Sequence, residues 1–216
     1  MPRSEFSLPP ILAQYVSRET IERLAVFHER LIAWQARINL VSDSTLPLFW
    51  NRHVADSIQL LHFAPKAKTW VDIGTGGGFP GLVIAICLSE RTASRVVMYE
   101  KSKKKCAFLR EVSRLTSARG IVINQEFHAN HSDLPASIDV VCARAVAPLA
   151  KLLELTQPII ARGALGLFPK GQNVDAEVTE ATRYWKFDLE MRQSLVDKQS
   201  TVVAVRSLEP RSDEQT

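Results

Sequence analysis

The chain has 216 residues, with 27 Lys and Arg against 23 Asp and Glu, a formal net charge of +4 and a pI near 9.1. This length suits one large domain or a domain with an appendage, and the mild positive charge permits a polyanionic partner without requiring one. The N-terminal sequence lacks the features of a signal peptide and no run reaches the ~18 apolar residues of a membrane span, so we expect a cytoplasmic protein without a membrane partner.

The first 65 residues carry helical patterns only. Ser17 is a suitable N-cap for a helix over residues 18–37, in which apolar side chains recur at helical intervals. A second helix is predicted over residues 46–63, with Arg52 and Asp56 placed four residues apart as an ion pair. We therefore expect residues 1–65 to form a helical extension that packs on the remainder of the chain.

After Pro65 the pattern changes to strands that alternate with helices, which is typical of a parallel sheet with crossovers. The predicted strands are residues 70–73, 96–100, 121–124, 139–143 and 164–168, and the predicted helices are residues 81–88, 103–116, 148–160 and 174–185. Residues 187–196 and 200–208 follow as two strands without a helix between them. The predicted fold class is α/β, with residues 66–216 forming a Rossmann-like doubly wound sheet of about seven strands whose last pair is antiparallel.

Three alternate glycines directly follow the first predicted strand. Gly74, Gly76 and Gly78 tolerate positive backbone dihedrals and lack a Cβ, so a ligand can approach the main chain closely there. A dinucleotide fingerprint requires a third glycine at the position that Phe79 occupies, and the pattern fails. The series of Asp72 and the three glycines instead resembles the first motif of class I S-adenosylmethionine-dependent methyltransferases, and an acidic side chain suits the cationic parts of that cofactor. The alternative is that the turn only connects a strand to a helix.

A second acidic residue ends the next predicted strand. The carboxylate of Glu100 is suited to accept hydrogen bonds from both hydroxyls of a ribose. NAD-binding folds share this placement, so Glu100 supports a nucleoside site without choosing between cofactors. The carboxyl ends of parallel strands share one edge of the sheet, and the ligand is expected there.

The residues after the fourth strand restrict the acceptor of a methyl group. Methyltransferases that act on exocyclic amines of bases carry Asn or Asp followed by Pro-Pro and an aromatic residue there, whereas residues 142–148 read Cys-Ala-Arg-Ala-Val-Ala-Pro. A ring-carbon acceptor needs a cysteine nucleophile, and Cys142 is better explained as a reduced core residue, as are Cys87 and Cys106, which show no metal-ligand spacing. An acceptor with a free lone pair, such as guanine N7, needs no general base.

Several cationic side chains also fall near the expected site. Arg144 is suited to clamp the cofactor carboxylate or the O6 and N7 edge of guanine, and a structural ion pair with Asp72 or Glu100 is the alternative. Lys170 is suited to meet a phosphate or the cofactor, with Phe168 and Phe79 shaping an aromatic slot for a base.

Other basic residues lie further from that site. Lys103 and Lys104 open a basic stripe on a predicted helix, which fits either a phosphate backbone or a solvated face. His53 is a candidate substrate contact, and we expect it to lie in a surface network with Arg52 and Asp56.

Five motifs together resemble the ribosomal RNA small subunit methyltransferase G family, also called the glucose-inhibited division protein B family. They are Asn39-Leu40, Arg52-His53-x-x-Asp56-Ser57, the segment 72–81 with its Gly-Phe-Pro-Gly end, Ser102-x-Lys104-Lys105 with Phe108-Leu109, and Arg144-Ala with Lys170-Gly171. The resemblance covers residues 39–171. It implies a bacterial cytosolic enzyme that methylates N7 of one guanine in 16S rRNA with S-adenosylmethionine.

The resemblance also implies roles for individual residues. The cofactor residues that it implies, together with those read from the glycine motif, are Gly74, Gly76, Gly78, Phe79, Glu100, Ala129, Asn130 and Arg144, and the expected substrate or RNA residues are Arg52, His53, Lys103, Lys104 and Lys170. The chain departs from the family after the third strand, where Arg-x-Glu is usual and His128-Ala129-Asn130 stands here. The amide oxygen of Asn130 is still able to accept from an adenine amino group.

The expected partner is 16S ribosomal RNA or the small ribosomal subunit, and the expected state is a monomer. Two other functions stay open from the residues alone. One is a class I methyltransferase for a small molecule or protein, which excess RNA would not inhibit. The other is a non-catalytic RNA-binding or assembly module, which would bind no cofactor.

Overall fold

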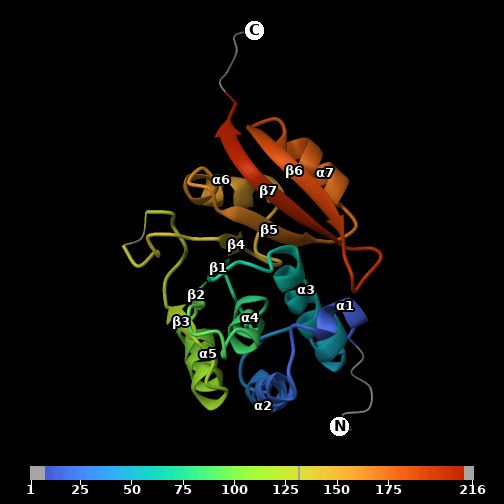
Figure 1. The fold of residues 1–216 in the computed structure, drawn as a ribbon, viewed down its shortest axis with the longest axis vertical. Helices are drawn as coiled ribbons and strands as arrows, with labels where there is room; N and C mark the ends of the chain where they lie inside the picture. Colours follow the sequence, from blue (N-terminus) through green and yellow to red (C-terminus); the bar gives the residue numbers. More distant parts are fainter. Residues whose placement is uncertain (1–7, 131, 212–216) are drawn as a thin grey trace.

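A computed structural model describes residues 8–130 and 132–211 (Figure 1). Within them the helices are α1 (Pro10–Ala13), α2 (Arg18–Gln35), η2 (Leu46–Leu48), η3 (Phe49–Val54), α3 (Ala55–Phe63), α4 (Gly81–Cys87), α5 (Lys103–Leu115), α6 (Leu149–Ile160) and α7 (Val174–Ala181). The strands are β1 (Thr69–Ile73), β2 (Arg95–Tyr99), β3 (Gly120–Ile123), β4 (Val140–Cys142), β5 (Leu165–Lys170), β6 (Trp185–Gln193) and β7 (Thr201–Pro210). The alternation of strands and helices after residue 65 is confirmed.

The strands form one seven-stranded sheet in the order β3-β2-β1-β4-β5-β7-β6. Strands β1 to β5 are parallel, and β7 runs antiparallel to both β5 and β6. Strand β1 is central, and its Val71 pairs with Val97 of β2 on one side and Val141 of β4 on the other. The winding direction therefore reverses at β1 and β4, which is where ligands bind in doubly wound sheets. The expected fold class is confirmed.

Both faces of the sheet are covered, as Figure 1 shows. Helices α2, α3, α4 and α5 contribute to the hydrophobic core on one face, and α6 and α7 contribute to the core on the other. Successive strand residues point to opposite faces, so Trp70 packs in the first core and Val71 in the second, and both are fully buried. Strands buried on both sides need near-continuous apolar sequence, which explains the apolar runs.

The N-terminal helices are anchored through one aromatic cluster. The ring of Phe27 on α2 lies 5.4 Å from the Phe49 ring, 5.3 Å from the Phe79 ring and 6.1 Å from the Phe108 ring, measured between centroids. Phe79 belongs to the glycine-rich turn after β1, and Phe108 to α5. The helical residues before position 65 are thus packed directly on the segment expected to bind the cofactor.

The second N-terminal helix differs from its prediction as one regular helix over residues 46–63. It consists of a short 3-10 turn, a π-helical segment and only then the α-helix. The predicted ion pair between Arg52 and Asp56 is also wrong, because the carboxylate of Asp56 bonds to Arg144 instead. π-Helical segments are rare and occur mostly at functional sites. Here the segment carries His53 toward the sheet.

Two further element boundaries differ from their predictions because of strand pairing. Helix α7 ends at Ala181 rather than continuing to residue 185, because Trp185 already pairs with Pro210 at the start of β6. The predicted strand over residues 187–196 accordingly begins earlier and ends at Gln193. Local patterns place the elements, whereas sheet pairing sets where they begin and end.

Gly81→Ala should destabilise the fold. A Cβ at this position would lie 2.6 Å from Asp72 Oδ2 and 2.8 Å from Met98 Cγ. Relieving such overpacking costs about 1–3 kcal/mol, which exceeds the gain of at most ~1 kcal/mol from replacing glycine within a helix. We expect the urea midpoint to fall by the corresponding amount.

Gly171→Ala is the control, since a Cβ there meets nothing within 4 Å and its φ is not positive. Its midpoint should stay unchanged or rise slightly. Equal midpoints for the two variants would show that the close contact at Gly81 is not real.

Candidate functional site

The turn after β1 has the backbone that the glycine pattern predicts. Gly74, Gly76 and Gly78 have φ values of +64°, +57° and +97°. The turn is closed by a hydrogen bond of 2.8 Å from Gly78 N to Thr75 O, and Thr75 N donates to Tyr99 O at the end of β2. Residues with a Cβ rarely adopt these dihedrals, so glycine is strongly favoured at all three places.

The three glycines nevertheless face different surroundings. A Cβ at Gly76 would meet nothing closer than the Gly74 carbonyl oxygen, at 3.7 Å, so this face of the turn is open. A Cβ at Gly74 would lie 2.8 Å from Val146 Cγ2, and one at Gly78 would lie 3.0 Å from Leu82 Cβ. The expectation that each glycine offers open main chain holds for Gly76 alone, because Gly78 is buried against the core.

Glu100 lies next to this open face and is 8% exposed. Its carboxylate accepts hydrogen bonds from Gly76 N at 3.0 Å and from Ser102 N at 2.7 Å, which ties the glycine turn to the start of α5. The open side of Gly76, the Gly74 carbonyl oxygen and the Glu100 carboxylate together present acceptors to an ammonium group and to hydroxyls. These residues fit S-adenosylmethionine, whose amino acid end and ribose carry such donors.

Asp72 does not face that space. Its side chain is fully buried beneath the turn, where Oδ2 accepts from Gly81 N at 2.8 Å. Burial is the largest cause that raises its pKa to about 7. The expectation that Asp72 meets the cationic parts of the cofactor is therefore wrong, and the carboxyl instead fixes the beginning of α4.

The segment after β3 runs alongside the end of β2. Asn124 Nδ2 donates to Glu100 O and to Lys101 O, each at 3.0 Å, and the Phe127 ring packs edge-on against Tyr99 at 5.1 Å. Ala129 is half-buried and Asn130 is exposed. Their predicted place beside the adenine stays a prediction. His131, which follows the segment His128-Ala129-Asn130, lies outside the described residues.

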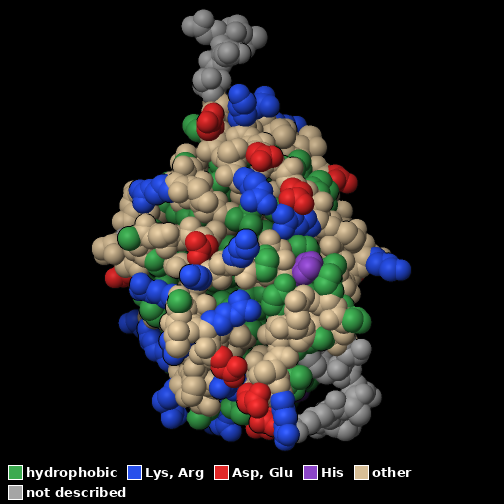
Figure 2. Space-filling view, in the orientation of Figure 1, with side chains coloured by type: hydrophobic (Ala, Val, Ile, Leu, Met, Phe, Trp, Pro, Cys, Tyr) green, Lys and Arg blue, Asp and Glu red, His purple; other side chains and the backbone are tan. Residues whose placement is uncertain are grey.

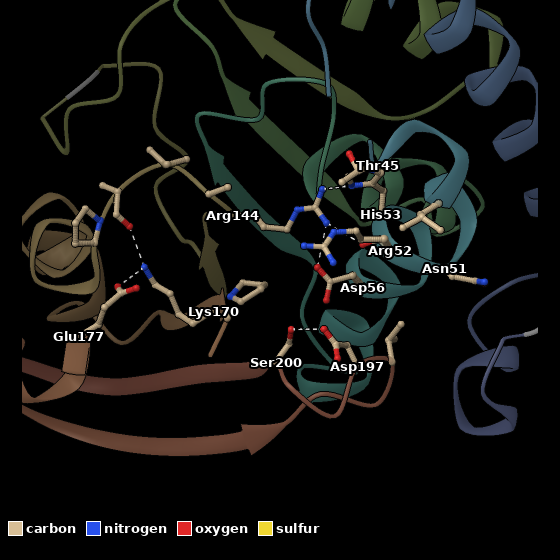
Figure 3. Close-up of a pocket in the computed structure, with 18 residues that line it drawn as sticks. Thr45, Asn51, Arg52, His53, Asp56, Arg144, Lys170, Glu177, Asp197 and Ser200 are labelled. Atoms are coloured by element: carbon tan, nitrogen blue, oxygen red, sulfur yellow. Dashed lines mark hydrogen bonds and ion pairs between the residues drawn. The ribbon is translucent and has the colours of Figure 1, made fainter. Parts of the chain in front are cut away.

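A cavity of about 750 Å³ lies beside the turn, between η3 and the ends of β4, β5 and the β6–β7 loop (Figure 3). We call it the rim pocket. Its lining combines cations, carboxylates and small apolar side chains, namely Thr45, Leu48, Asn51, Arg52, His53, Asp56, Arg144, Ala145, Val146, Ala147, Pro148, Pro169, Lys170, Gly171, Glu177, Val196, Asp197 and Ser200. Val146 lies on Gly74 and also lines the pocket, so it separates the pocket from the glycine turn.

Arg144 crosses the rim pocket toward η3 and is held on several sides (Figure 3). Its Nη1 donates to Asp56 Oδ2 at 3.0 Å and to Arg52 O at 3.1 Å, and its guanidinium carbon lies 5.2 Å from the centroid of the Phe79 ring. The alternative of a structural ion pair is thus realised, but with Asp56 rather than with Asp72 or Glu100. The guanidinium joins the N-terminal helices to the end of β4.

His53 completes this cluster. The Nη2 of Arg144 lies 2.7 Å from His53 Nδ1, and since arginine only donates, Nδ1 accepts and the proton sits on Nε2, which donates to Thr45 Oγ1 at 3.1 Å. The ring stacks on Phe79 at 4.7 Å and is only 6% exposed. Burial and the neighbouring Arg144 lower its pKa to about 3. His53, expected on the surface, is therefore buried with a neutral imidazole, whereas Arg52 is exposed.

Lys170 lines the far side of the rim pocket, opposite Arg144 (Figure 3). Its Nζ donates to Glu177 Oε2 at 2.7 Å and to Ala147 O at 2.9 Å. The aromatic slot predicted around it is wrong, because Phe168 is fully buried and Phe79 is 4% exposed within the aromatic cluster.

The basic stripe lies elsewhere on the molecule. Lys103 and Lys104 are exposed at the start of α5, outside the rim pocket lining. Figure 2 shows Lys and Arg side chains along the edge of the molecule where α5 lies. Glu100, which contacts Gly76, lies three residues before the start of this helix, so the stripe begins beside the glycine turn rather than beside the pocket.

Cys142 behaves as the core residue that its sequence predicts. The thiol is fully buried and donates to the carbonyl oxygen of Val71 at 3.5 Å. Burial is the first cause that raises its pKa well above the ordinary value of a thiol, and the nearby Asp72 adds to it. A thiol held in this form is a poor nucleophile, which opposes a ring-carbon acceptor.

Sequence reasoning missed several residues of the rim pocket, among them Thr45, Glu177 and Asp197. Thr45 and Asp197 carry no motif, and Glu177 lies in an ordinary helical pattern. They join the site only because the start of η2, α7 and the β6–β7 loop fold to the same end of the sheet. A lone acidic residue on a predicted helix gives no sequence signal of such a place.

Solved structures with a similar fold are methyltransferases. The structure of the SAH-bound Podospora anserina methyltransferase PaMTH1 has a TM-score of 0.57 at 14% identity and covers 93% of this chain and 98% of its own. A putative O-methyltransferase from Klebsiella pneumoniae has a TM-score of 0.54 at 14% identity and covers 95% and 93%. At such low identity these likenesses show the fold. Together with the glycine turn and Glu100, the fold defines a class I S-adenosylmethionine-dependent methyltransferase.

Sequence comparison identifies the family. The family described as rRNA small subunit methyltransferase G (GidB) matches residues 20–205. The ribosomal RNA small subunit methyltransferase G of Rhodopseudomonas palustris (strain BisB18) is 48% identical over 196 residues, which are 91% of this chain and 84% of the relative. That of Bradyrhizobium sp. (strain BTAi1) is 48% identical over 194 residues, 90% and 87% of the two chains. The chain belongs to the rRNA small subunit methyltransferase G family.

Gly76→Ala should weaken the binding of S-adenosylmethionine by at least about tenfold. The new methyl group points into the open face of the turn, where we expect the cofactor to contact the main chain of the protein. The strained φ of +57° also costs stability, by about 1 kcal/mol. Calorimetric titration of the cofactor separates the two effects.

Gly163→Ala is the matched control for Gly76→Ala. Gly163 has a φ of +99°, and a Cβ there would meet nothing within 4 Å. It precedes β5, so it lies at the amino ends of the parallel strands, whereas the glycine turn lies at their carboxyl ends. It should lose similar stability and keep its cofactor affinity. Equal affinities for both variants would remove Gly76 from the cofactor site.

His53→Gln should remove one contribution to the pH dependence of stability. The pKa of His53 is about 3 in the folded chain against an ordinary 6.5, so the unfolded chain binds one more proton between these values. Stability from the neutral ring is complete above pH 6.5 and is lost as the pH falls, by at most ~1.4 kcal/mol per pH unit. Urea unfolding at pH 7, 6 and 5 should therefore show the free energy of unfolding of the unmutated chain falling relative to that of His53→Gln as the pH falls. The raised pKa of Asp72 contributes a slope of opposite sign to both chains and cancels in this difference. A difference that is constant with pH would contradict a buried neutral imidazole.

Proposed function

We propose that the glycine turn holds the methyl donor and that the rim pocket receives the acceptor base. The protein transfers a methyl group from S-adenosylmethionine to N7 of a guanine in 16S rRNA. When bound, the cofactor supplies an activated methyl group on a sulfonium, so the residues contribute mainly alignment and exclusion of water. Gly74 and Gly76, with the main chain of Phe79, contact its amino acid end. Glu100 contacts its ribose.

The positions of the side chains support the remaining roles that we propose. Ala129 and Asn130, beside the end of β2, meet the adenine. Arg144 orients the base from the floor of the rim pocket. Arg52, Lys103 and Lys104 are exposed and meet RNA phosphates, whereas His53 and Lys170 line the pocket and act on its shape.

One observation carries the choice of a ring nitrogen as acceptor. The imidazole and the carboxylates that line the rim pocket are already engaged: His53 with Arg144 and Thr45, Asp56 with Arg144, Glu177 with Lys170, and Asp197 with Ser200. The buried Cys142 thiol is equally unsuited to attack a ring carbon. Guanine N7 has an in-plane lone pair and loses no proton when it is methylated. It therefore needs no general base, which fits the described lining.

The coarser properties of the protein are consistent with this activity. Among the described residues no helix is long and apolar enough to cross a membrane. We infer that the enzyme is a cytoplasmic monomer that acts on 16S rRNA or on the small ribosomal subunit. We also infer two parts, with residues 1–65 as a helical extension on the methyltransferase domain 66–216. The extension supplies one wall of the rim pocket through η3.

The test is methyl transfer to small-subunit RNA from cells that lack this gene. Purified protein should transfer one labelled methyl group per RNA, and chemical cleavage at 7-methylguanosine should map it to a single position. A matched transcript made with 7-deazaguanosine, which has a C–H group in place of N7, should accept no methyl group. Transfer to the 7-deaza transcript would overturn N7 as the acceptor. Methyl transfer to a small molecule or a protein that excess RNA does not inhibit would indicate that RNA is not the substrate.

A further inference from the structure

The connection from β4 to α6 lies between the two halves of the site. Ala145 in this connection has a φ of +56°, a conformation that an alanine seldom adopts, so its surroundings must hold it there. On one side of Ala145, Arg144 reaches the N-terminal helices. On the other side, Val146 rests on Gly74. The position of this short connection therefore sets both the wall of the rim pocket and the cover of the glycine turn.

Two charged side chains from other elements fasten the far end of the connection. Oε2 of Glu177 accepts from Leu149 N, the first residue of α6, at 2.7 Å and from Lys170 Nζ at 2.7 Å. Lys170 Nζ also donates to Ala147 O at 2.9 Å. Four groups, one each from β5, α7, the connection and the start of α6, thus close one ring of contacts, which we call the loop bracket. The side chain of Lys170 is 9% exposed and that of Glu177 is 25% exposed.

The charge of Lys170 is already used within the bracket. A phosphate ligand needs an ammonium group that is accessible and able to turn toward the RNA. The Nζ of Lys170 instead points away from the centre of the rim pocket, toward Glu177 (Figure 3). Breaking such a shielded pair by removing one partner leaves an uncompensated charge, whereas replacing both partners by apolar side chains is often tolerated.

We propose that Lys170 and Glu177 are positioning residues, which hold residues 145–148 so that the methyl donor and the acceptor base meet in line. The inference rests on the proposed methyl transfer. Neither residue touches the reacting atoms. Each acts through Ala147 or Leu149 on Val146 and Arg144, and small errors of alignment in a displacement reaction cost rate rather than binding.

The experiment compares Lys170→Met, Glu177→Met and the double variant in steady-state methyl transfer and in RNA binding at several salt concentrations. Each single variant should lower kcat at least about tenfold, with the Kd for RNA changed less than about twofold and its salt dependence unchanged. The double variant should regain thermal stability, because no unpaired charge remains, while its kcat stays low. Lys170→Arg, which keeps the charge and the donors, should recover part of kcat.

Lys151→Met is the control, because it removes a charge from α6 whose pair with Glu154 is exposed and far weaker. It should change neither kcat nor RNA affinity. If Lys170 were a phosphate ligand, Lys170→Met would weaken RNA binding and lower the salt slope by about 1, and Glu177→Met would leave binding equal or tighter. If the bracket were only structural, kcat would recover in the double variant together with stability. Either result overturns the proposal.

Hydrogen exchange separates this proposal from the proposed function. The amide of Leu149 is protected by Glu177, so it should exchange at least about tenfold faster in Glu177→Met. This readout needs no RNA substrate. If the unmutated protein failed to methylate RNA while the amide of Leu149 exchanged faster in Glu177→Met, the proposed function would be refuted and the loop bracket would still be supported. Unchanged exchange would refute the bracket even in an active enzyme.

Discussion

The packing of Phe79 is the contact on which the rest of the site depends. Its ring stacks on Phe27 of α2 at 5.3 Å and on His53 of η3 at 4.7 Å, and Arg144 lies over it at 5.2 Å. The same residue belongs to the glycine turn. One side chain therefore fixes the turn, the N-terminal helices and the end of β4 relative to one another. Loss of this ring would disturb the cofactor side and the acceptor side together.

Most of the charged residues near the site bond to other parts of the protein and stabilise its local structure. Asp72 fixes the start of α4, Arg144 joins η3 to β4, and the pair of Lys170 and Glu177 fastens the connection before α6. This arrangement suits a reaction whose leaving group is already activated. What the enzyme must supply is alignment, and alignment depends on rigid surroundings.

Sequence reasoning predicted some residues of the site correctly and others wrongly. The positive φ values of the glycine turn and the place of Glu100 beside it were predictable, because they depend on local backbone conformation and on the end of a strand, both of which leave a pattern in the chain. Phe168, Asp72 and the pairing of Arg52 with Asp56 were misjudged, because whether a side chain faces a ligand or the core depends on packing partners distant in sequence.

The sequence by itself determined the class of fold, the methyl donor and the family, since these rest on hydrophobic periodicity, on glycine at positions of positive φ and on short motifs. Only the tertiary structure decided which side chains meet. Asp56 and Arg144 are 88 residues apart, and Ala147 is 23 residues from Lys170. Such pairs form because parallel strands bring their carboxyl ends to one edge of the sheet, and the residues that gather there need no common spacing along the chain.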